Sequence, residues 1–142
     1  MSGFSADWLT LREPVDHASI NAEVRAACMR AFAGRELVRV VDLGCGTGSN
    51  LRSLAPALGV RQHWSLVDND PALLEIASSA DSDVEVTCRR MDLASSDFGP
   101  LFSEADLVTA SALFDLFSID AIERLAAAVA AERCVFYAVI TY

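Results

Sequence analysis

The segment with the clearest chemical role contains an acid followed by three glycines at alternating positions. Asp42 lies two residues before Gly44, and Gly46 and Gly48 come next. Glycine permits a positive φ and lets a ligand approach the backbone where a Cβ would collide. A helical pattern begins at residues 47–50, so the positive end of a helix points at the same place. The segment predicts a ligand site of bare backbone groups, and the alternative is a tight turn that binds nothing.

Two further acids bear on the nature of this ligand. Asp68 ends an apolar run about 20 residues beyond Gly48, where an acid can accept hydrogen bonds from both hydroxyls of a ribose. Such an acid supports an adenosine ligand but does not distinguish a dinucleotide from other adenosine compounds. By contrast, Asp70 precedes Pro71, which is typical of a helix cap followed by a first-turn proline. We therefore expect Asp70 to be structural.

The spacing of the glycines argues against a dinucleotide. The fingerprint G-x-G-x-x-G/A places its third small residue at position 49, where this chain has Ser49, and Gly48 breaks the register. The run Asp-Leu-Gly-Cys-Gly-Thr-Gly over residues 42–48 instead resembles motif I of the class I S-adenosylmethionine-dependent methyltransferases. An oxidoreductase with a nucleotide cofactor is the less favoured alternative.

The resemblance implies S-adenosylmethionine as cofactor and S-adenosylhomocysteine as product. In the family, an acid after the third strand accepts from adenine N6, and the next backbone N–H donates to N1. Asp92 and Leu93 match these positions, and the alternative is an ordinary loop acid with an apolar neighbour. The cofactor residues that the resemblance implies are Asp42, Gly44, Cys45, Gly46, Gly48, Asp68, Asn69, Asp92, Leu93, Ala110, Ser111 and Arg12.

The last three residues of this set belong to the methionine end of the cofactor. The resemblance places Ala110 and Ser111, at the end of the fourth strand, against the methionine moiety. Arg12 is the candidate partner of the methionine carboxylate, because a guanidinium fork suits a carboxylate. The alternative is that Arg12 is a solvated surface residue.

Catalysis of methyl transfer depends mainly on position. Holding the nucleophile and the methyl group in line supplies most of the acceleration, and a base is needed only if the acceptor must lose a proton early. His17 is a candidate base if the N-terminal helix covers the site, and Asp115 could orient a substrate. His63 is expected at the opposite end of its strand, and Phe114 and Phe117 are expected in the core. We expect a small-molecule acceptor, whose reacting atom stays open.

Alternating strand and helix patterns position these residues. Leu37–Leu43 predicts a buried parallel strand, because its apolar residues recur without polar alternation. Further strands are predicted at residues 64–67, 84–88, 105–110 and 134–140. Helices are predicted from the glycine turn to Gly59, around residues 73–77 and after a cap at Ser118. Together with the resemblance, the pattern implies an α/β fold, a Rossmann-like three-layer α/β/α sandwich with a mostly parallel sheet of order 3-2-1-4-5.

The chain is expected to form one domain, with a helical cap over residues 1–36 and a cofactor-binding core over residues 37–142. Within the cap, a short amphipathic helix at residues 7–12 is predicted to stop at Pro14. A longer helix is predicted over residues 15–33, with Gly34 as its end.

Composition limits the classes of partner. The 142 residues carry a net charge of −9 and include no lysine, which disfavours nucleic-acid binding. No run approaches the roughly 18 apolar residues of a spanning helix, so no membrane association is expected. The first seven residues lack the basic start of a signal peptide, which favours a cytoplasmic location. The four cysteines form no C-x-x-C pair, so no metal site is expected.

The resemblance runs from Leu37 to the end of the chain. The family's sheet normally has seven strands, and the last two have no counterpart here, so the sequence resembles a truncated enzyme. An apolar edge strand at residues 135–139 predicts a homodimer through that edge or poor solubility. The missing strands and the lack of a clear base leave a second hypothesis, a non-catalytic module that binds S-adenosylmethionine or a partner.

Overall fold

Five parallel strands form one sheet in the order β3-β2-β1-β4-β5, which confirms the predicted topology. The computed structural model describes residues 4–79 and 83–140, so residues 1–3 of the predicted cap, and Thr141 and Tyr142 of the predicted core, lie outside it. The strands are β1 (Leu37–Leu43), β2 (Arg61–Asp68), β3 (Glu85–Arg90), β4 (Leu107–Ser111) and β5 (Val135–Val139).

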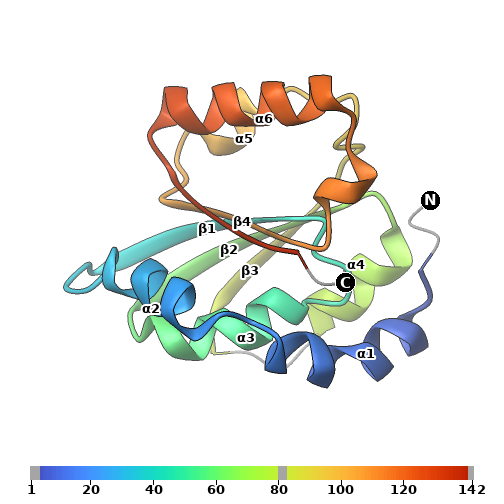
Figure 1. Cartoon of the computed structure of the whole chain (residues 1–142), viewed down its shortest axis with the longest axis horizontal. Helices are drawn as coiled ribbons and strands as arrows, with labels where there is room; N and C mark the ends of the chain where they lie inside the picture. Colours follow the sequence, from blue (N-terminus) through green and yellow to red (C-terminus); the bar gives the residue numbers. More distant parts are fainter. Residues whose placement is uncertain (1–3, 80–82, 141–142) are drawn as a thin grey trace.

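Helices cover both faces of the sheet and give the expected three layers (Figure 1). Figure 1 shows α5 (Gly99–Phe102) and α6 (Ile119–Glu132) on one face, and α1 (Ala6–Ala18), α2 (Ala22–Arg30), α3 (Ser49–Leu58) and α4 (Pro71–Ser79) on the other. A short 3₁₀ helix, η1 (Phe114–Leu116), follows β4. Within the described residues, no helix is long and apolar enough to cross a membrane.

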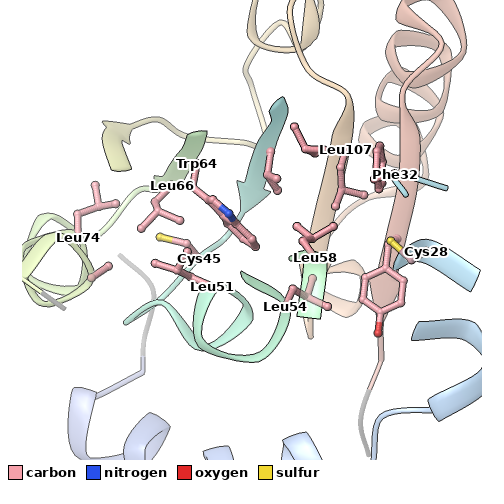
Figure 2. Close-up of a cluster of buried hydrophobic side chains, with 14 residues drawn as sticks. Cys28, Phe32, Cys45, Leu51, Leu54, Leu58, Trp64, Leu66, Leu74 and Leu107 are labelled. Atoms are coloured by element: carbon pink, nitrogen blue, oxygen red, sulfur yellow. The ribbon is translucent and has the colours of Figure 1, made fainter. Parts of the chain in front are cut away.

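Each face of the sheet has its own hydrophobic core. On the face of α2, α3 and α4, Trp64 is fully buried among side chains that include Phe32, Leu51 and Leu54 (Figure 2). On the opposite face, the rings of Phe98 and Phe102 stack with centroids 5.6 Å apart. Burial on both faces explains why β1 is an almost unbroken apolar run, as expected for a central parallel strand.

The N-terminal helices differ from the prediction. Pro14 lies inside α1 and does not end it, and the predicted helix at residues 15–33 is wrong. The break falls at residues 19–21, where Asn21 Oδ1 accepts hydrogen bonds from the N–H groups of Glu23 and Val24, each at 3.0 Å. Asn21 thus begins a new helix after the break, whereas Pro14 is accommodated within α1.

Strand boundaries also differ from the prediction in places. β2 begins at Arg61, three residues before the predicted start, because Gln62 satisfies its buried amide locally. Its Nε2 donates to the carbonyl oxygens of Ala55 and Val60, and its Oε1 accepts from Trp64 Nε1 at 2.8 Å. β3 continues to Arg90, whereas β4 begins at Leu107, two residues later than predicted.

Candidate functional site

A cavity of about 360 Å³ opens at the carboxyl ends of β1, β2 and β3, next to α1. Ligands of open α/β sheets bind at this edge, where the strand order reverses. Ten of the predicted site residues line this cavity: Arg12, Asp42, Gly44, Cys45, Gly46, Asp68, Asn69, Asp92, Leu93 and Ser111. Four others do not belong to the lining formed by the described residues: Gly48, Ala110, His17 and Asp115.

The glycine turn brings backbone atoms of Gly44 and Gly46 to the cavity. Gly44 and Gly46 have φ values of +63° and +55°, which other residues rarely adopt. A Cβ on Gly44 would lie 2.9 Å from Leu113 Cδ1, and a Cβ on Gly46 would lie 3.4 Å from Leu9 Cδ1. A Cβ at Gly44 would therefore displace Leu113, and the positive φ values favour glycine at both positions.

Two further residues of the turn, Gly48 and Cys45, have different surroundings. Gly48 caps α3 with a φ of +95°, and a Cβ there would meet Arg52 and Ala77. Cys45 contacts the cavity, but it is 5% exposed and belongs to the buried cluster of Figure 2. Burial raises the pKa of its thiol, which argues against a reactive thiolate. We infer that Gly48 and Cys45 shape the turn.

Asp68 connects the glycine turn to the end of β2. Its Oδ2 accepts a hydrogen bond from Gly46 N at 2.9 Å, and its Oδ1 accepts one from Asp70 N at 3.0 Å. Its backbone carbonyl accepts from Met91 N at 3.0 Å, which brings the segment after β3 to the same place. Each carboxylate oxygen has a second lone pair, so both can still accept from a ligand. As predicted, Asp70 caps α4 by accepting from the N–H of Ala72 at 2.9 Å.

Asp42 is the most deeply buried acid of the cavity, with 1% of its surface exposed. Its Oδ1 accepts from Asn50 Nδ2 at 3.2 Å, and the same amide nitrogen donates to Thr109 Oγ1 at 3.2 Å. Its Oδ2 has no hydrogen-bond partner among the described residues. Burial, and then the nearby charge of Asp68, raise the pKa of Asp42 to about 7, against the lowering effect of the Asn50 hydrogen bond.

The segment after β3 forms another wall of the cavity. Asp92 is exposed, and its Oδ1 accepts from Ala94 N at 3.1 Å, whereas Leu93 is buried. Arg124 of α6 holds this segment by donating to the carbonyl oxygens of Ala94 at 2.6 Å and Ser96 at 2.7 Å. Arg124, on a helix that covers the opposite face of the sheet from α1, therefore holds this side of the cavity in place.

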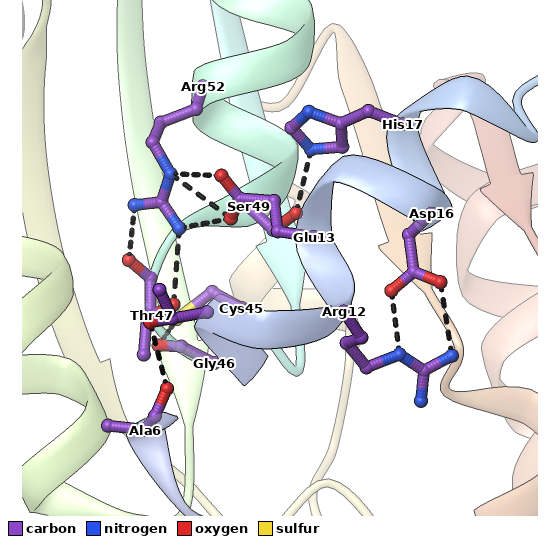
Figure 3. Close-up of polar contacts among 11 residues, drawn as sticks. Ala6, Arg12, Glu13, Asp16, His17, Cys45, Gly46, Thr47, Ser49 and Arg52 are labelled. Carbon is purple, nitrogen blue, oxygen red and sulfur yellow. Dashed lines mark hydrogen bonds and ion pairs between the residues drawn. The ribbon is translucent and has the colours of Figure 1, made fainter. Parts of the chain in front are cut away.

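Helix α1 contributes Leu9, Arg12 and Asp16 to the lining. None of its 13 residues, all of which are described, is buried. Arg12 Nε donates to Asp16 Oδ2 at 2.7 Å, so the guanidinium that was predicted to bind a carboxylate already binds one within its own helix (Figure 3). That hydrogen bond is the main reason why the pKa of Arg12 is raised.

Polar contacts attach α1 to the glycine turn and α3 (Figure 3). Arg52 Nε donates to Glu13 Oε2 at 2.9 Å, and Arg52 Nη1 donates to the Thr47 carbonyl at 2.8 Å. The hydrogen bond from Arg52 lowers the pKa of Glu13. His17 Nε2 lies 2.9 Å from Ser49 Oγ, so this ring braces the start of α3 and does not belong to the cavity lining.

The end of β4 and η1 form a further side of the cavity. Ser111 lines the cavity together with Leu116 and Phe117, whereas Asp115 is exposed outside it. The prediction that Phe117 is only a core residue is therefore incomplete, because the ring packs on the core and also lines the cavity. Phe114 stacks on Phe136 with centroids 5.7 Å apart, as expected for a core residue.

Several lining residues were not predicted. Thr47 belongs to the same turn as the glycines, and Ser49 and Asn50 begin α3 directly after it, so their polar side chains were a usable signal. Leu9 and Asp16 come from a helix whose position over the turn depends on contacts distant in sequence. Such contacts leave no local pattern.

Comparison with known proteins gives the wider context. The sequence profile of a family described as a methyltransferase domain matches residues 40–132. No curated protein matches the sequence. Among solved structures, an S-adenosylmethionine-dependent methyltransferase from Mesorhizobium loti is similar, with a TM-score of 0.54 and 22% identity over 79% of this chain and 50% of that chain.

Two further structures have the same fold. The plantazolicin methyltransferase in complex with S-adenosylhomocysteine has a TM-score of 0.60 and 17% identity over 87% of this chain and 49% of its own. The arsenic(III) S-adenosylmethionine methyltransferase from Chlamydomonas reinhardtii has a TM-score of 0.54 and 27% identity over 82% of this chain and 43% of its own. The chain thus spans half or less of the length of these three proteins.

Proposed function

The chain belongs to the methyltransferase domain family, and on this premise we propose that it binds S-adenosylmethionine and transfers its methyl group to a small molecule. The observation that carries the proposal is the position of three acids around one cavity. Asp42, Asp68 and Asp92 lie at or just beyond the ends of three adjacent strands, next to a glycine turn. This is the edge at which such a sheet binds a nucleotide.

The residues present fit the proposed cofactor. Gly44 and Gly46 line the cavity with backbone atoms alone, and Asp42 presents a buried oxygen that needs a donor. In this proposal Asp68 binds the ribose hydroxyls and Asn69 lies beside them. Asp92 and Leu93 bind the adenine. Ser111 faces the methionine end. Arg12 binds the methionine carboxylate only if its guanidinium group leaves Asp16.

When bound, the cofactor supplies a methyl group on a cationic sulfur with a good leaving group. The chain's own contribution is position, since the described residues that line the cavity include neither His17 nor Asp115. A reaction without a general base suits an acceptor that is already nucleophilic. A small acceptor fits the similarity to a structure named for methylation of arsenic(III).

Titration calorimetry tests the cofactor assignment. We expect S-adenosylmethionine and S-adenosylhomocysteine to bind and NAD not to bind. Asp68→Ala should weaken both by at least about tenfold, because buried charge-assisted hydrogen bonds contribute about 1.5–3 kcal/mol. Glu75→Ala, an exposed acid on α4 outside the cavity, is the matched control and should bind normally. Binding of NAD alone, or of no nucleoside, would contradict the proposal.

Turnover separates the enzyme from a module that only binds cofactor. Family membership favours the enzyme, and formation of S-adenosylhomocysteine in the presence of a panel of small nucleophiles is the direct measurement. Asp68→Ala should slow formation of this product at a cofactor concentration near the wild-type Kd, where occupancy of the site limits the rate. Product formation that Asp68→Ala leaves unchanged would show that the activity belongs to another site or to a contaminant.

A further inference from the structure

Four of the residues that line the cavity near α1 and η1 have no part in the proposed cofactor contacts. α1 contributes Leu9 and Asp16, and η1 with the residue after it contributes Leu116 and Phe117. Leu9 adjoins the glycine turn, since a Cβ at Gly46 would lie 3.4 Å from Leu9 Cδ1. We call these four residues the acceptor side of the cavity, because the cofactor leaves them for a second ligand.

The electrostatics of Arg12 show that α1 and η1 lie close together. The pKa of Arg12 is raised mainly by its hydrogen bond to Asp16, and the charge of Asp115 on η1 adds to this increase. A charge on η1 acts on a side chain of α1 only over a short distance. The residues of the acceptor side therefore surround one part of the cavity.

The carboxylate of Asp16 is bound by Arg12 at both oxygens. Arg12 Nε donates to Oδ2 at 2.7 Å, and Arg12 Nη2 donates to Oδ1 at 3.1 Å (Figure 3). The two side chains are 30% and 24% exposed and lie four residues apart on one helix. A pair of this kind changes an equilibrium by no more than about fivefold. The guanidinium can therefore exchange Asp16 for another carboxylate at little cost.

This exchange would leave Asp16 as a negative charge without a counter-charge. Arg12 is the single cation among the described residues that line the cavity, and the other charged groups there are Asp42, Asp68 and Asp92. These carboxylates would repel an anionic acceptor, whereas a cationic group would replace the guanidinium beside Asp16. The three apolar members of the acceptor side favour an apolar body for the same ligand.

Resting on the proposed function, we propose that the methyl acceptor is an apolar molecule with a cationic nitrogen, and that Asp16 binds this nitrogen after the cofactor carboxylate has taken Arg12. Asp16 thus positions the acceptor and selects it by charge. The contact is a hydrogen bond from N–H to a carboxylate oxygen, and no covalent bond forms or breaks at Asp16. The cofactor binds first, because its carboxylate exposes the group that the acceptor needs.

Saturation-transfer NMR at pH 7 measures weak binding to the complex with S-adenosylhomocysteine, which cannot turn over. The probes are 2-phenylethylamine and tryptamine, which are cationic at this pH, together with the alcohol and the carboxylate of each ring at the same chain length. Each amine should bind at least about tenfold more tightly than its alcohol, and the carboxylates should bind most weakly. The preference for the amine should fall below about threefold in the free protein and with 5′-methylthioadenosine, which lacks a carboxylate, because Arg12 then stays on Asp16.

Asp16→Asn separates this role from a structural one. The variant should lose the preference for the amine, and it should bind S-adenosylhomocysteine about two- to fivefold more tightly, because Arg12 no longer leaves a charged partner. Its affinity for 5′-methylthioadenosine should not change. The control is Asp7→Asn, which removes the same charge from the exposed start of α1, outside the lining formed by the described residues, and should leave all these affinities unchanged.

The outcomes distinguish this inference from the proposed function. Equal binding of amine and alcohol to the wild-type complex would overturn the inference and leave the proposed function intact. The same holds for an amine preference that persists in a folded Asp16→Asn protein, or for S-adenosylhomocysteine affinity that does not increase in it. Failure of S-adenosylhomocysteine to bind the wild type would overturn both.

Discussion

Arg52 and Glu13 join α3 to α1 through a bond from Arg52 Nε to Glu13 Oε2 at 2.9 Å. The same guanidinium holds the glycine turn through the Thr47 carbonyl, so one side chain sets the distance between helix and turn. Because α1 buries none of its 13 residues, this contact and the His17–Ser49 bond carry much of its attachment. Segments with few buried contacts open at the lowest free energy.

Arg52→Gln should loosen α1 without unfolding the core. Loss of a partly exposed bidentate pair lowers the opening free energy by about 1 kcal/mol, which corresponds to roughly fivefold faster amide exchange. Hydrogen exchange of residues 6–18 measures the effect. Arg61→Gln, at the exposed start of β2, is the control and should leave this exchange unchanged. Exchange in α1 that is as slow in Arg52→Gln as in the wild type would show that other contacts hold the helix.

Asp42→Asn should make the free energy of unfolding less dependent on pH. Since the pKa of Asp42 is raised from 3.8 to about 7, its ionisation destabilises the native state. This penalty is absent below about pH 4, grows between pH 4 and 7, and is complete above pH 7. We expect the variant to have a free energy of unfolding up to about 4 kcal/mol higher than the wild type at pH 8, and a nearly equal one at pH 4.

Denaturant titrations of both proteins at pH 4, 6 and 8 measure this difference. Asp120→Asn, on α6, serves as the control, because its side chain is exposed and should shift stability by little at any pH. A stability difference between Asp42→Asn and the wild type that does not change with pH would contradict the predicted titration of Asp42.

Comparing Gly46→Ala with Gly59→Ala should separate the effect of backbone strain from the effect of a side chain at the cavity. Gly46 and Gly59 both have positive φ, at +55° and +64°, so alanine costs each about 1 kcal/mol of stability. Gly46 lines the cavity, and a Cβ there would lie 3.4 Å from Leu9 Cδ1, whereas Gly59 does not belong to the lining formed by the described residues and nothing lies within 4 Å of a Cβ there. S-adenosylhomocysteine affinity should therefore fall at least about tenfold in Gly46→Ala alone. Equal affinities in the two variants would show that the turn does not contact the ligand.

The edge strand β5 should mediate self-association. Within the described residues it pairs with β4 on one side alone, and its other side presents free backbone groups. Sedimentation velocity should show a dimer whose fraction increases with protein concentration. Ile140→Lys, next to this strand, should shift the distribution to monomer, whereas Ile119→Lys, on α6, should not. A monomer at all concentrations in the wild type would refute the dimer.

Local patterns predicted the parts of the fold that local physics determines. β1 is predicted to the residue because Val40, Val41 and their neighbours need burial on both faces. The caps at Asp70 and Ser118 are also local, since each side chain accepts from a backbone N–H two or three residues further along. The glycine turn belongs to this class, and its positive φ values follow from composition.

Some errors come from local side-chain hydrogen bonds that a pattern of apolar residues does not reveal, and others from contacts distant in sequence. The buried amide of Gln62 is satisfied by Ala55 and Trp64, both within seven residues of it, so the apolar pattern alone excluded this polar residue from β2. The bond between His17 and Ser49 makes that histidine a brace, although its type suggested a base. The unpartnered oxygen of Asp42 likewise depends on packing that no spacing in the sequence reveals.

The two tryptophans of the chain report on different parts of it. Trp8 lies on α1 with 48% of its surface exposed and the Arg12 guanidinium 5.9 Å from its ring, whereas Trp64 is fully buried in the sheet. Emission from an exposed indole is shifted to the red and quenched by solutes such as iodide, and emission from a buried indole is not. The native protein thus carries one fluorophore for movement of the helix beside the cavity and another for integrity of the core, without any added label.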